Sequence, residues 1–239
     1  MPKSILKQWL RKLPFAFTQN QRYDLLTRRI IRQSCQPQSN CIDAGTHKGE
    51  IFDYFLQYAP RGTHYGFEPI PVLFRQLKRK YRHCANCHLY NLALSDEKQL
   101  VSFNYVLTNP AYSGIKKRQY DRENERDVQI EVQTALLDQV IPENLPVRLI
   151  KIDVEGGEMC VLKGAERILS TFHPLVIFEF GIGGSDIYGT TPEVLFSFFA
   201  GFSYKISLLE DYLKNRDALT LQEFRDQFYQ KKNFVFIAH

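Results

Sequence analysis

The chain of 239 residues is 44% hydrophobic and 13% aromatic, which is enough apolar material for a folded core and excludes an intrinsically disordered protein. The net charge is +5 at pH 7, and no apolar run approaches the roughly 20 residues that a membrane-spanning helix needs. The N-terminal residues lack the continuous apolar stretch of a secretion signal, so we expect a cytoplasmic protein.

Positive charge is concentrated at the N-terminus, where residues 1–34 carry eight Lys or Arg side chains against Asp24 alone. Apolar residues recur there at helical spacing, at Ile5, Leu6, Trp9, Leu10 and Leu13. We therefore assign residues 1–36 to a basic N-terminal helical extension and residues 37–239 to the main domain. Such a helix commonly packs its apolar stripe on its own domain. The alternative is peripheral contact of residues 1–13 with an anionic membrane.

From residue 40 onward, short apolar strands alternate with amphipathic helices. We predict strands at 40–45, 64–68, 88–94, 148–153, 175–180, 202–208 and 233–239, and helices at 50–59, 71–81, 159–172, 192–200 and 221–232. Two segments of alternating polarity, 100–107 and 128–133, are interpreted as half-exposed additions. The pattern predicts one doubly wound, Rossmann-like α/β domain with a seven-stranded, mostly parallel sheet and helices on both faces.

A glycine-containing turn follows the first predicted strand, in the sequence Asp43-Ala44-Gly45-Thr46-His47-Lys48-Gly49. Such a turn lets a ligand approach the backbone at a helix N-terminus, but it lacks the G-x-G-x-x-G pattern that admits the pyrophosphate of NAD or FAD. Glu68, at the end of the second strand, is placed to accept hydrogen bonds from ribose hydroxyls. Asp43 supplies negative charge for an ammonium group. A nucleoside with an ammonium group and no pyrophosphate describes S-adenosylmethionine, and we expect Asp43, Gly45, Thr46, Gly49 and Glu68 to bind it.

Three acids leave the fourth core strand together, in the sequence Lys151-Ile152-Asp153-Val154-Glu155-Gly156-Gly157-Glu158. Glu158 suits the first turn of a helix. Asp153 and Glu155 precede that helix and could orient or deprotonate a substrate hydroxyl, or hold a divalent cation. Lys151 points to the face opposite its strand neighbours and could pair with an acid, and Glu179 arrives at the same edge. We take Lys151, Asp153, Glu155 and Glu179 as catalytic candidates and predict no metal site.

Two further segments have simpler interpretations. Cys84-Ala85-Asn86-Cys87-His88 has the spacing of a c-type haem attachment site or of half a zinc site, but the sequence offers no second ligand pair. Five cysteines without an export signal indicate reduced thiols. The charged run at 116–127 is typical of a solvated loop, although its position would also suit a substrate lid.

In this order and spacing, CIDAGTHKGE, YGFEP, NLALSDE and LIKIDVEGGEMCVLKGAERIL resemble the FkbM family of S-adenosylmethionine-dependent methyltransferases. The resemblance covers roughly residues 40–180 and implies a class I methyltransferase fold, which we assign to residues 37–239. It also implies methyl transfer by direct displacement, usually to a hydroxyl of a sugar, glycolipid or natural product. The partner would then be a small-molecule or glycan acceptor.

The resemblance also implies roles for single residues. Asp43, Gly45 and Gly49 match the cofactor loop, Glu68 the ribose acid, Leu92 and Ala93 the segment that passes the adenine, and Asp153 the position nearest the transferred methyl group. This sequence departs from the usual Gly-Ala-Asn-x-Gly loop by placing Thr46 and His47 there, and His47 is interpreted as a helix-entry residue rather than a base. The family offers no single agreed catalytic base.

Two alternatives belong to other function classes. Asn109-Pro110-Ala111-Tyr112 resembles the N-P-P-Y motif of nucleic-acid base methyltransferases, but its second proline is missing and it follows an added strand. We therefore do not expect nucleic acid as a partner. A cofactor-binding scaffold without catalysis is disfavoured by Asp153, Glu155 and Glu179, because buried acids destabilise a fold unless a ligand, cation or water meets them.

Overall fold

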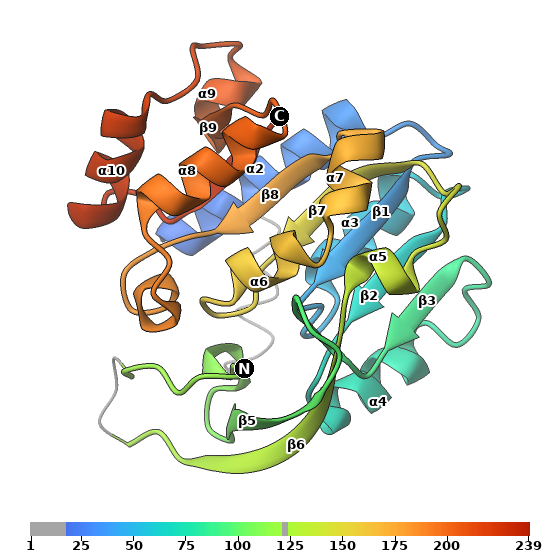
Figure 1. The fold of residues 1–239 in the computed structure, drawn as a ribbon. Coiled ribbons are helices and arrows are strands. Elements are labelled where there is room, and N and C mark those ends of the chain that lie inside the picture. Colours follow the sequence, from blue (N-terminus) through green and yellow to red (C-terminus); the bar gives the residue numbers. More distant parts are fainter. Residues whose placement is uncertain (1–17, 121–123) are drawn as a thin grey trace.

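The computed structural model describes residues 18–120 and 124–239, which form two sheets with helices around them (Figure 1). The larger sheet has seven strands in the order β3 (Cys87–Tyr90), β2 (His64–Phe67), β1 (Asn40–Ala44), β7 (Val147–Ile152), β8 (Leu175–Glu179), β10 (Val235–Ala238) and β9 (Ile206–Leu208). Neighbouring strands run parallel except for β10, which is antiparallel to both β8 and β9. The predicted seven-stranded, mostly parallel α/β sheet is confirmed.

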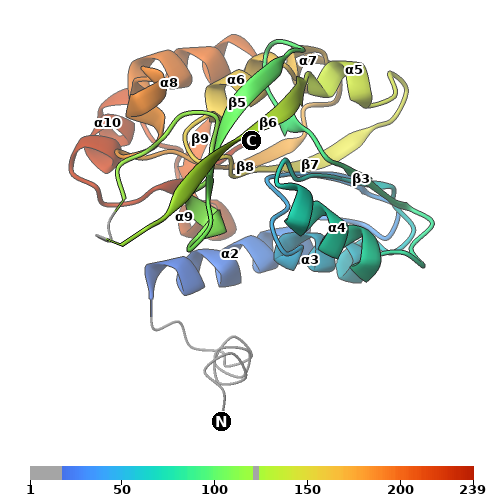
Figure 2. The same ribbon diagram turned by 90° about the horizontal axis from the view of Figure 1, so that it is seen from below.

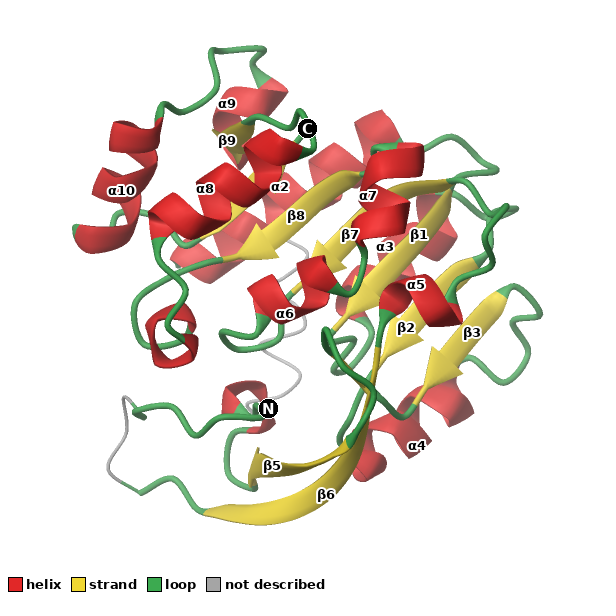
Figure 3. Cartoon of the chain, viewed as in Figure 1, coloured by secondary structure: helices red, strands yellow, loops and turns green. Residues whose placement is uncertain are grey.

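Helices cover both faces of this sheet (Figures 2 and 3). One face packs on α2 (Gln19–Ser34), α3 (Glu50–Tyr58), α4 (Pro71–Lys80) and α9 (Leu209–Leu213). The other packs on α5 (Leu137–Val140), α6 (Glu158–Lys163), α7 (Glu166–Phe172), α8 (Pro192–Gly201) and α10 (Leu221–Tyr229). Strand residues alternate between the two cores, with Ile42 and Ile150 in one and Cys41 and Leu149 in the other. Among the described residues, no helix is long and apolar enough to cross a membrane.

Helix starts follow local sequence signals. Thr18 and Thr220 open α2 and α10 with capping boxes, and Thr191 followed by Pro192 opens α8. Helix α2 packs against α3 and α9 and buries one stripe of side chains in the core below the sheet. The predicted helix at 1–13 lies outside the described residues.

The smaller sheet is an insertion with the order β4 (Ala93–Leu94), β6 (Asp127–Ala135) and β5 (Leu100–Val106). It lies beyond the carboxyl ends of the central strands of the larger sheet (Figure 1). A single strand at 88–94 is therefore wrong, because β3 ends at Tyr90 and Ala93 pairs with Thr134 of β6. The side chain of Asn91 donates to the carbonyl oxygens of Glu68 and Pro69, both at 2.8 Å, and fixes the chain where it leaves the main sheet.

Two other predicted elements differ in extent. The helix at 159–172 is divided into α6 and α7 at Gly164, where an added Cβ would lie 2.2 Å from the carbonyl oxygen of Ser95. The insertion therefore approaches the backbone too closely for a continuous helix with a side chain there. The strand at 202–208 begins only at Ile206, because residues before it complete the turn after α8, with the Tyr204 N–H donating to the Phe199 carbonyl oxygen at 3.0 Å.

Candidate active site

The turn after β1 is tied to two neighbouring strands. The N–H groups of Gly45 and Thr46 both donate to the carbonyl oxygen of Phe67, at 3.0 and 2.9 Å. Gly45 has a φ of 85°, and a Cβ at this position would lie 1.9 Å from the carbonyl oxygen of Asp153. Only glycine fits both the left-handed backbone and this close approach. The loops after β1, β2 and β7 therefore meet at one point.

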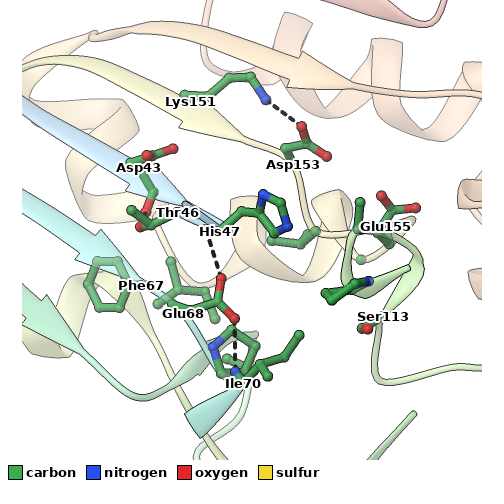
Figure 4. Close-up of a pocket in the computed structure, with 18 of the residues that line it drawn as sticks. Asp43, Thr46, His47, Phe67, Glu68, Ile70, Ser113, Lys151, Asp153 and Glu155 are labelled. Carbon is green, nitrogen blue, oxygen red and sulfur yellow. Dashed lines mark hydrogen bonds and ion pairs between the residues drawn. The ribbon is translucent and has the colours of Figure 1, made fainter. Parts of the chain in front are cut away.

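The carboxylate of Glu68 is held in place by backbone donors (Figure 4). The N–H of His47 donates to Oε2 at 2.8 Å and the N–H of Ile70 donates to Oε1 at 2.9 Å. Burial raises the pKa of Glu68 to about 7, against the opposing effect of these two hydrogen bonds. Each oxygen keeps a further lone pair, so a fixed carboxylate is available to two hydroxyl donors.

Asp43, Lys151 and Asp153 form a charged group at the ends of adjacent strands. Asp43 and Lys151 are paired across β1 and β7, and the Lys151 ammonium donates to Oδ2 of Asp153 at 3.0 Å (Figure 4). Burial raises the pKa of Asp43 to about 8, with Lys151 opposing it and Asp153 adding to it. Burial acts to raise the pKa of Asp153, but the Lys151 ammonium, together with a hydrogen bond from Glu179 and the nearby His47, lowers the pKa of that carboxyl. Asp153 is therefore the acid of this group that stays ionised at neutral pH.

A cavity of about 330 Å³ opens at this edge of the sheet. The lining includes most of the predicted cofactor residues, namely Asp43, Gly45, Thr46, Glu68, Leu92, Ala93 and Asp153. Apolar side chains of Phe67, Ile70 and Phe103 complete its wall beside Glu68. Gly49 does not line the cavity. It caps α3 with a φ of 78°, where a Cβ would lie 2.3 Å from the hydroxyl oxygen of Tyr81.

Residues 43–206, more than half of the chain, match the methyltransferase FkbM domain. The chain belongs to the FkbM methyltransferase family. No curated protein sequence gives a significant match.

Solved structures resemble this FkbM family chain at low sequence identity. Methyltransferase FkbM from Methylobacillus flagellatus KT is 15% identical with a TM-score of 0.54, over 86% of this chain and 44% of that one. Protein SMU.1697c of Streptococcus mutans, solved in complex with SAH, is 11% identical with a TM-score of 0.49, over 90% of this chain and 95% of that one. Precorrin-6y C5,15-methyltransferase from Geobacter metallireducens GS-15 is 12% identical with a TM-score of 0.46, over 82% and 80%. The chain spans less than half the length of the Methylobacillus protein.

A second cavity of about 650 Å³ lies against the first. The two share the side chains of Lys151, Asp153 and Glu155 in their linings. Helix α2 contributes Tyr23 and Asp24 to the second cavity, and β8 contributes Glu179. The structure thus brings all four catalytic candidates to one place, where Lys151, Asp153 and Glu155 line both cavities and Glu179 lines the second.

The acids at this site lie close together, and their pKa values are shifted in different directions. Ligand oxygens of Asp153, Glu155 and Glu179 lie within 4.8 Å of one another, the one such group found among residues 18–120 and 124–239. Burial raises the pKa of Glu155 to about 8 and lifts that of Glu179 well above its usual range, with the charge of Asp153 adding to both shifts. The trio has the donor chemistry of a divalent cation site, but Lys151 and Arg118 already neutralise two of its members.

Arg118 is a site residue that the sequence interpretation missed. It comes from the loop between β5 and β6, pairs with Glu155, and places its guanidinium 4.8 Å from the ring centroid of Tyr112. The same loop donates the Lys116 N–H to the hydroxyl of Tyr188 at 3.0 Å. The charged run was expected to be solvated, and no local pattern distinguishes Arg118 from its charged neighbours. Residues 121–123 of that run lie outside the described part.

His47 and the cysteine motif also have defined places. His47 lines the first cavity with a φ of 50°, and its ring nitrogen lies 3.9 Å from Glu50. Its position near Asp153 contributes to the lowered pKa of that acid. Cys84 and Cys87 lie in the turn before β3 and at its first residue, and they belong to no metal-ligand group among the described residues.

Proposed function

We propose that this chain is an S-adenosylmethionine-dependent O-methyltransferase that acts on a hydroxyl of a sugar, glycolipid or other natural product. The observation that carries the proposal is the pairing of a glycine turn with a fixed acid, Gly45 with Glu68, in one cavity. The family membership supports methyl transfer. The choice of a hydroxyl acceptor rests on the acids beside that cavity.

The first cavity suits the methyl donor. Glu68 would accept two hydrogen bonds from ribose hydroxyls, since its carboxylate is already fixed by two backbone donors. Asp43 would face the amino-acid end of the donor, where an ammonium group favours its ionised form. Leu92, Ala93 and the apolar wall formed by Phe67 and Ile70 would enclose the adenine.

The second cavity suits the acceptor, because it meets the first at Asp153. The donor supplies a methyl group already activated on a sulfonium. The chain must therefore align the acceptor oxygen, exclude water and receive a proton. Asp153, kept ionised by Lys151, would accept the hydroxyl proton as the oxygen–carbon bond forms and the carbon–sulfur bond breaks. Glu155 and Glu179, whose carboxylates lie close to that of Asp153, would hydrogen-bond the acceptor.

Calorimetry with S-adenosylmethionine and its demethylated product tests the cofactor half. We expect the wild-type chain to bind both and Glu68→Ala to lose at least about 2 kcal/mol, which is more than tenfold in affinity, because both ribose hydrogen bonds go to a charged acceptor. Glu131→Gln is the matched control, since this exposed glutamate of β6 lines neither cavity. Undiminished binding by Glu68→Ala contradicts the assignment.

A screen for transfer of labelled methyl groups to sugars, glycolipids and metabolites tests the catalytic half. Asp153→Asn should keep donor binding and lower the rate about 10²–10⁴-fold, the usual contribution of a general base. Donor binding without transfer to any acceptor favours a scaffold instead. Transfer to RNA or DNA bases favours the nucleic-acid alternative.

A further inference from the structure

Six cations form an exposed basic face on the helices that cover one side of the main sheet. Its members are Arg29 and Arg32 of α2, Arg75, Lys78 and Arg79 of α4, and Arg82 just after α4. Each is exposed, and none makes an ion pair with another described residue. Asp53 of α3 is already paired with Lys80 at 2.6 Å.

The two helices that carry the basic face belong to one layer. Figure 2 shows α2, α3 and α4 along the same side of the sheet. Helix α2 contacts α3, and the ring of Phe52 in α3 lies 5.0 Å from that of Tyr81 at the end of α4. The buried stripes of α2, α3 and α4 meet in a single core below the sheet, so their exposed stripes point outward together. The six cations are therefore presented on one side of the molecule.

The sequence that precedes α2 adds charge of the same sign together with apolar anchors. Residues 1–17 contain Lys3, Lys7, Arg11 and Lys12 and no acidic residue, with Trp9 among several leucines and an isoleucine. They lie outside the described residues. Interleaved cations and large apolar residues are typical of segments that lie in a membrane interface.

We propose that the basic face binds the surface of an anionic membrane. Clustered Lys and Arg side chains are attracted to the negative surface potential of acidic phospholipids. RNA or DNA would meet the same charge, but the described residues of α2, α3 and α4 offer no exposed aromatic ring on which bases could stack. A row of packed helices presents a broad side to a planar partner. Gln19, Tyr23 and Asp24 of α2 also line the second cavity, so docking brings that cavity to the lipid head groups.

Vesicle binding of the full-length chain tests the proposal. Vesicles of phosphatidylcholine with phosphatidylglycerol should bind the protein, and vesicles of phosphatidylcholine alone should not. Binding should weaken as NaCl rises, since salt screens the attraction. The chain has one tryptophan, Trp9, so a blue shift of its fluorescence on adding the anionic vesicles reports directly on the N-terminal segment.

Charge-reversal variants distinguish the effect of the basic face on vesicle binding from the effect of net charge. The test variant carries Lys78→Glu, Arg79→Glu and Arg82→Glu, and the control carries Lys98→Glu, Lys163→Glu and Lys205→Glu, which are exposed elsewhere. Removal of three cations near the membrane should weaken vesicle binding about 100-fold or more, at roughly fivefold each. The control should bind much more like wild type. Equal melting temperatures show that both variants fold.

Three results would overturn the proposal. These are equal binding to both kinds of vesicle, equal weakening in the test and control variants, and tighter binding to poly(U) RNA than to the anionic vesicles. The proposal does not depend on methyl transfer, because none of the three substituted residues lines either cavity. A loss of vesicle binding with unchanged binding of S-adenosylmethionine would therefore concern the surface alone.

Discussion

Asp43 combines deep burial with a place at the end of a central strand. It is 2% exposed, and burial raises its pKa to about 8. A buried carboxyl of this kind is neutral at pH 7 unless a cation meets it. Lys151 is the cation already present, but it is shared with Asp153, to which it donates directly. An ammonium group of a ligand would complete the balance of charge.

The affinity for S-adenosylmethionine should therefore depend on pH through Asp43. Below its pKa of about 8 the proton must leave before the ligand ammonium can pair, so affinity should fall by up to about tenfold for each unit of pH. Above pH 8 the α-amino group of the ligand itself loses its proton, since its ordinary pKa is about 7.7–8.0. Calorimetry across this range should give a maximum near pH 8, with proton release below it.

Asp43→Asn is the matching variant, because it keeps the size of the side chain and removes the charge. It should bind the ligand more weakly at pH 8 and show a flatter dependence on pH. Glu131→Gln, an exposed site outside the cavities, should reproduce the wild-type curve. A wild-type affinity that does not change with pH would show that Asp43 does not pair with the ligand's ammonium group.

The loop between β5 and β6 is held to the main domain by polar contacts. Within the insertion, the side chain of Asn104 donates to the Tyr120 hydroxyl at 2.6 Å, and that hydroxyl donates to Asp127 at 2.5 Å. Arg118 then crosses to Glu155, and Lys116 to Tyr188. A Cβ on Gly183 would lie 3.6 Å from a guanidinium nitrogen of Arg118, so this side chain also approaches the loop after β8. Arg118 is thus one link between the insertion and two loops of the main sheet.

Removing that link should loosen the loop. In Arg118→Ala we expect the amide protons of Gly114 and Lys116 to exchange with solvent at least about tenfold faster, because the loop loses a buried charge pair. Hydrogen exchange read by mass spectrometry measures this. Arg126→Ala is the control, since its exposed side chain makes no ion pair with another described residue. Unchanged exchange in Arg118→Ala would show that other contacts hold the loop.

The main sheet and most residues that line the first cavity could be predicted because their signals are local. Apolar runs separated by amphipathic helices fix the strand count, and a strand that ends in Asp43-Ala44-Gly45 places its turn at the carboxyl edge. Glu68 and Asp153 follow from the same rule, since parallel strands end at one edge. Register then brings Asp43 beside Lys151, a pairing that the sequence alone does not state.

The insertion could not be predicted in the same way, because its role depends on contacts distant in sequence. Arg118 reaches Glu155 across 37 positions, and Tyr188 meets Lys116 across 72. The break at Gly164 likewise depends on the approach of Ser95, which a helical pattern does not reveal. Where tertiary contact decides a conformation, propensity and periodicity carry no signal for it.

The molecule gathers its buried acids at one end. Asp43, Glu68, Glu155 and Glu158 have pKa values raised by burial to about 8, 7, 8 and 7, respectively. All four lie at the carboxyl edge of the main sheet, whereas the rest of the two cores is largely apolar. Ionising these acids without a ligand opposes folding, so the site that we propose for catalysis is also a source of instability.

The stability of the ligand-free chain should consequently fall as pH rises from 5 to 8.5. An acid with a raised pKa in the folded state binds its proton there more tightly than in the unfolded chain. The stability from this linkage is full below the unfolded pKa of about 4 and is lost as pH passes through the folded values of about 7 and 8. Asp153 acts in the opposite sense, since its lowered pKa withdraws stability only below about pH 4.

The melting temperature should therefore be highest near pH 5 and lower by roughly 10 °C at pH 8.5, for a loss of a few kcal/mol of unfolding free energy. Asp43→Asn should reduce that slope while Glu131→Gln leaves it unchanged, and S-adenosylmethionine at pH 8 should restore much of the lost stability by binding the folded state alone. A melting temperature that stays level or rises over this range would mean that these acids are solvated in the folded chain, which contradicts the burial of Asp43 and Glu68 beside the first cavity.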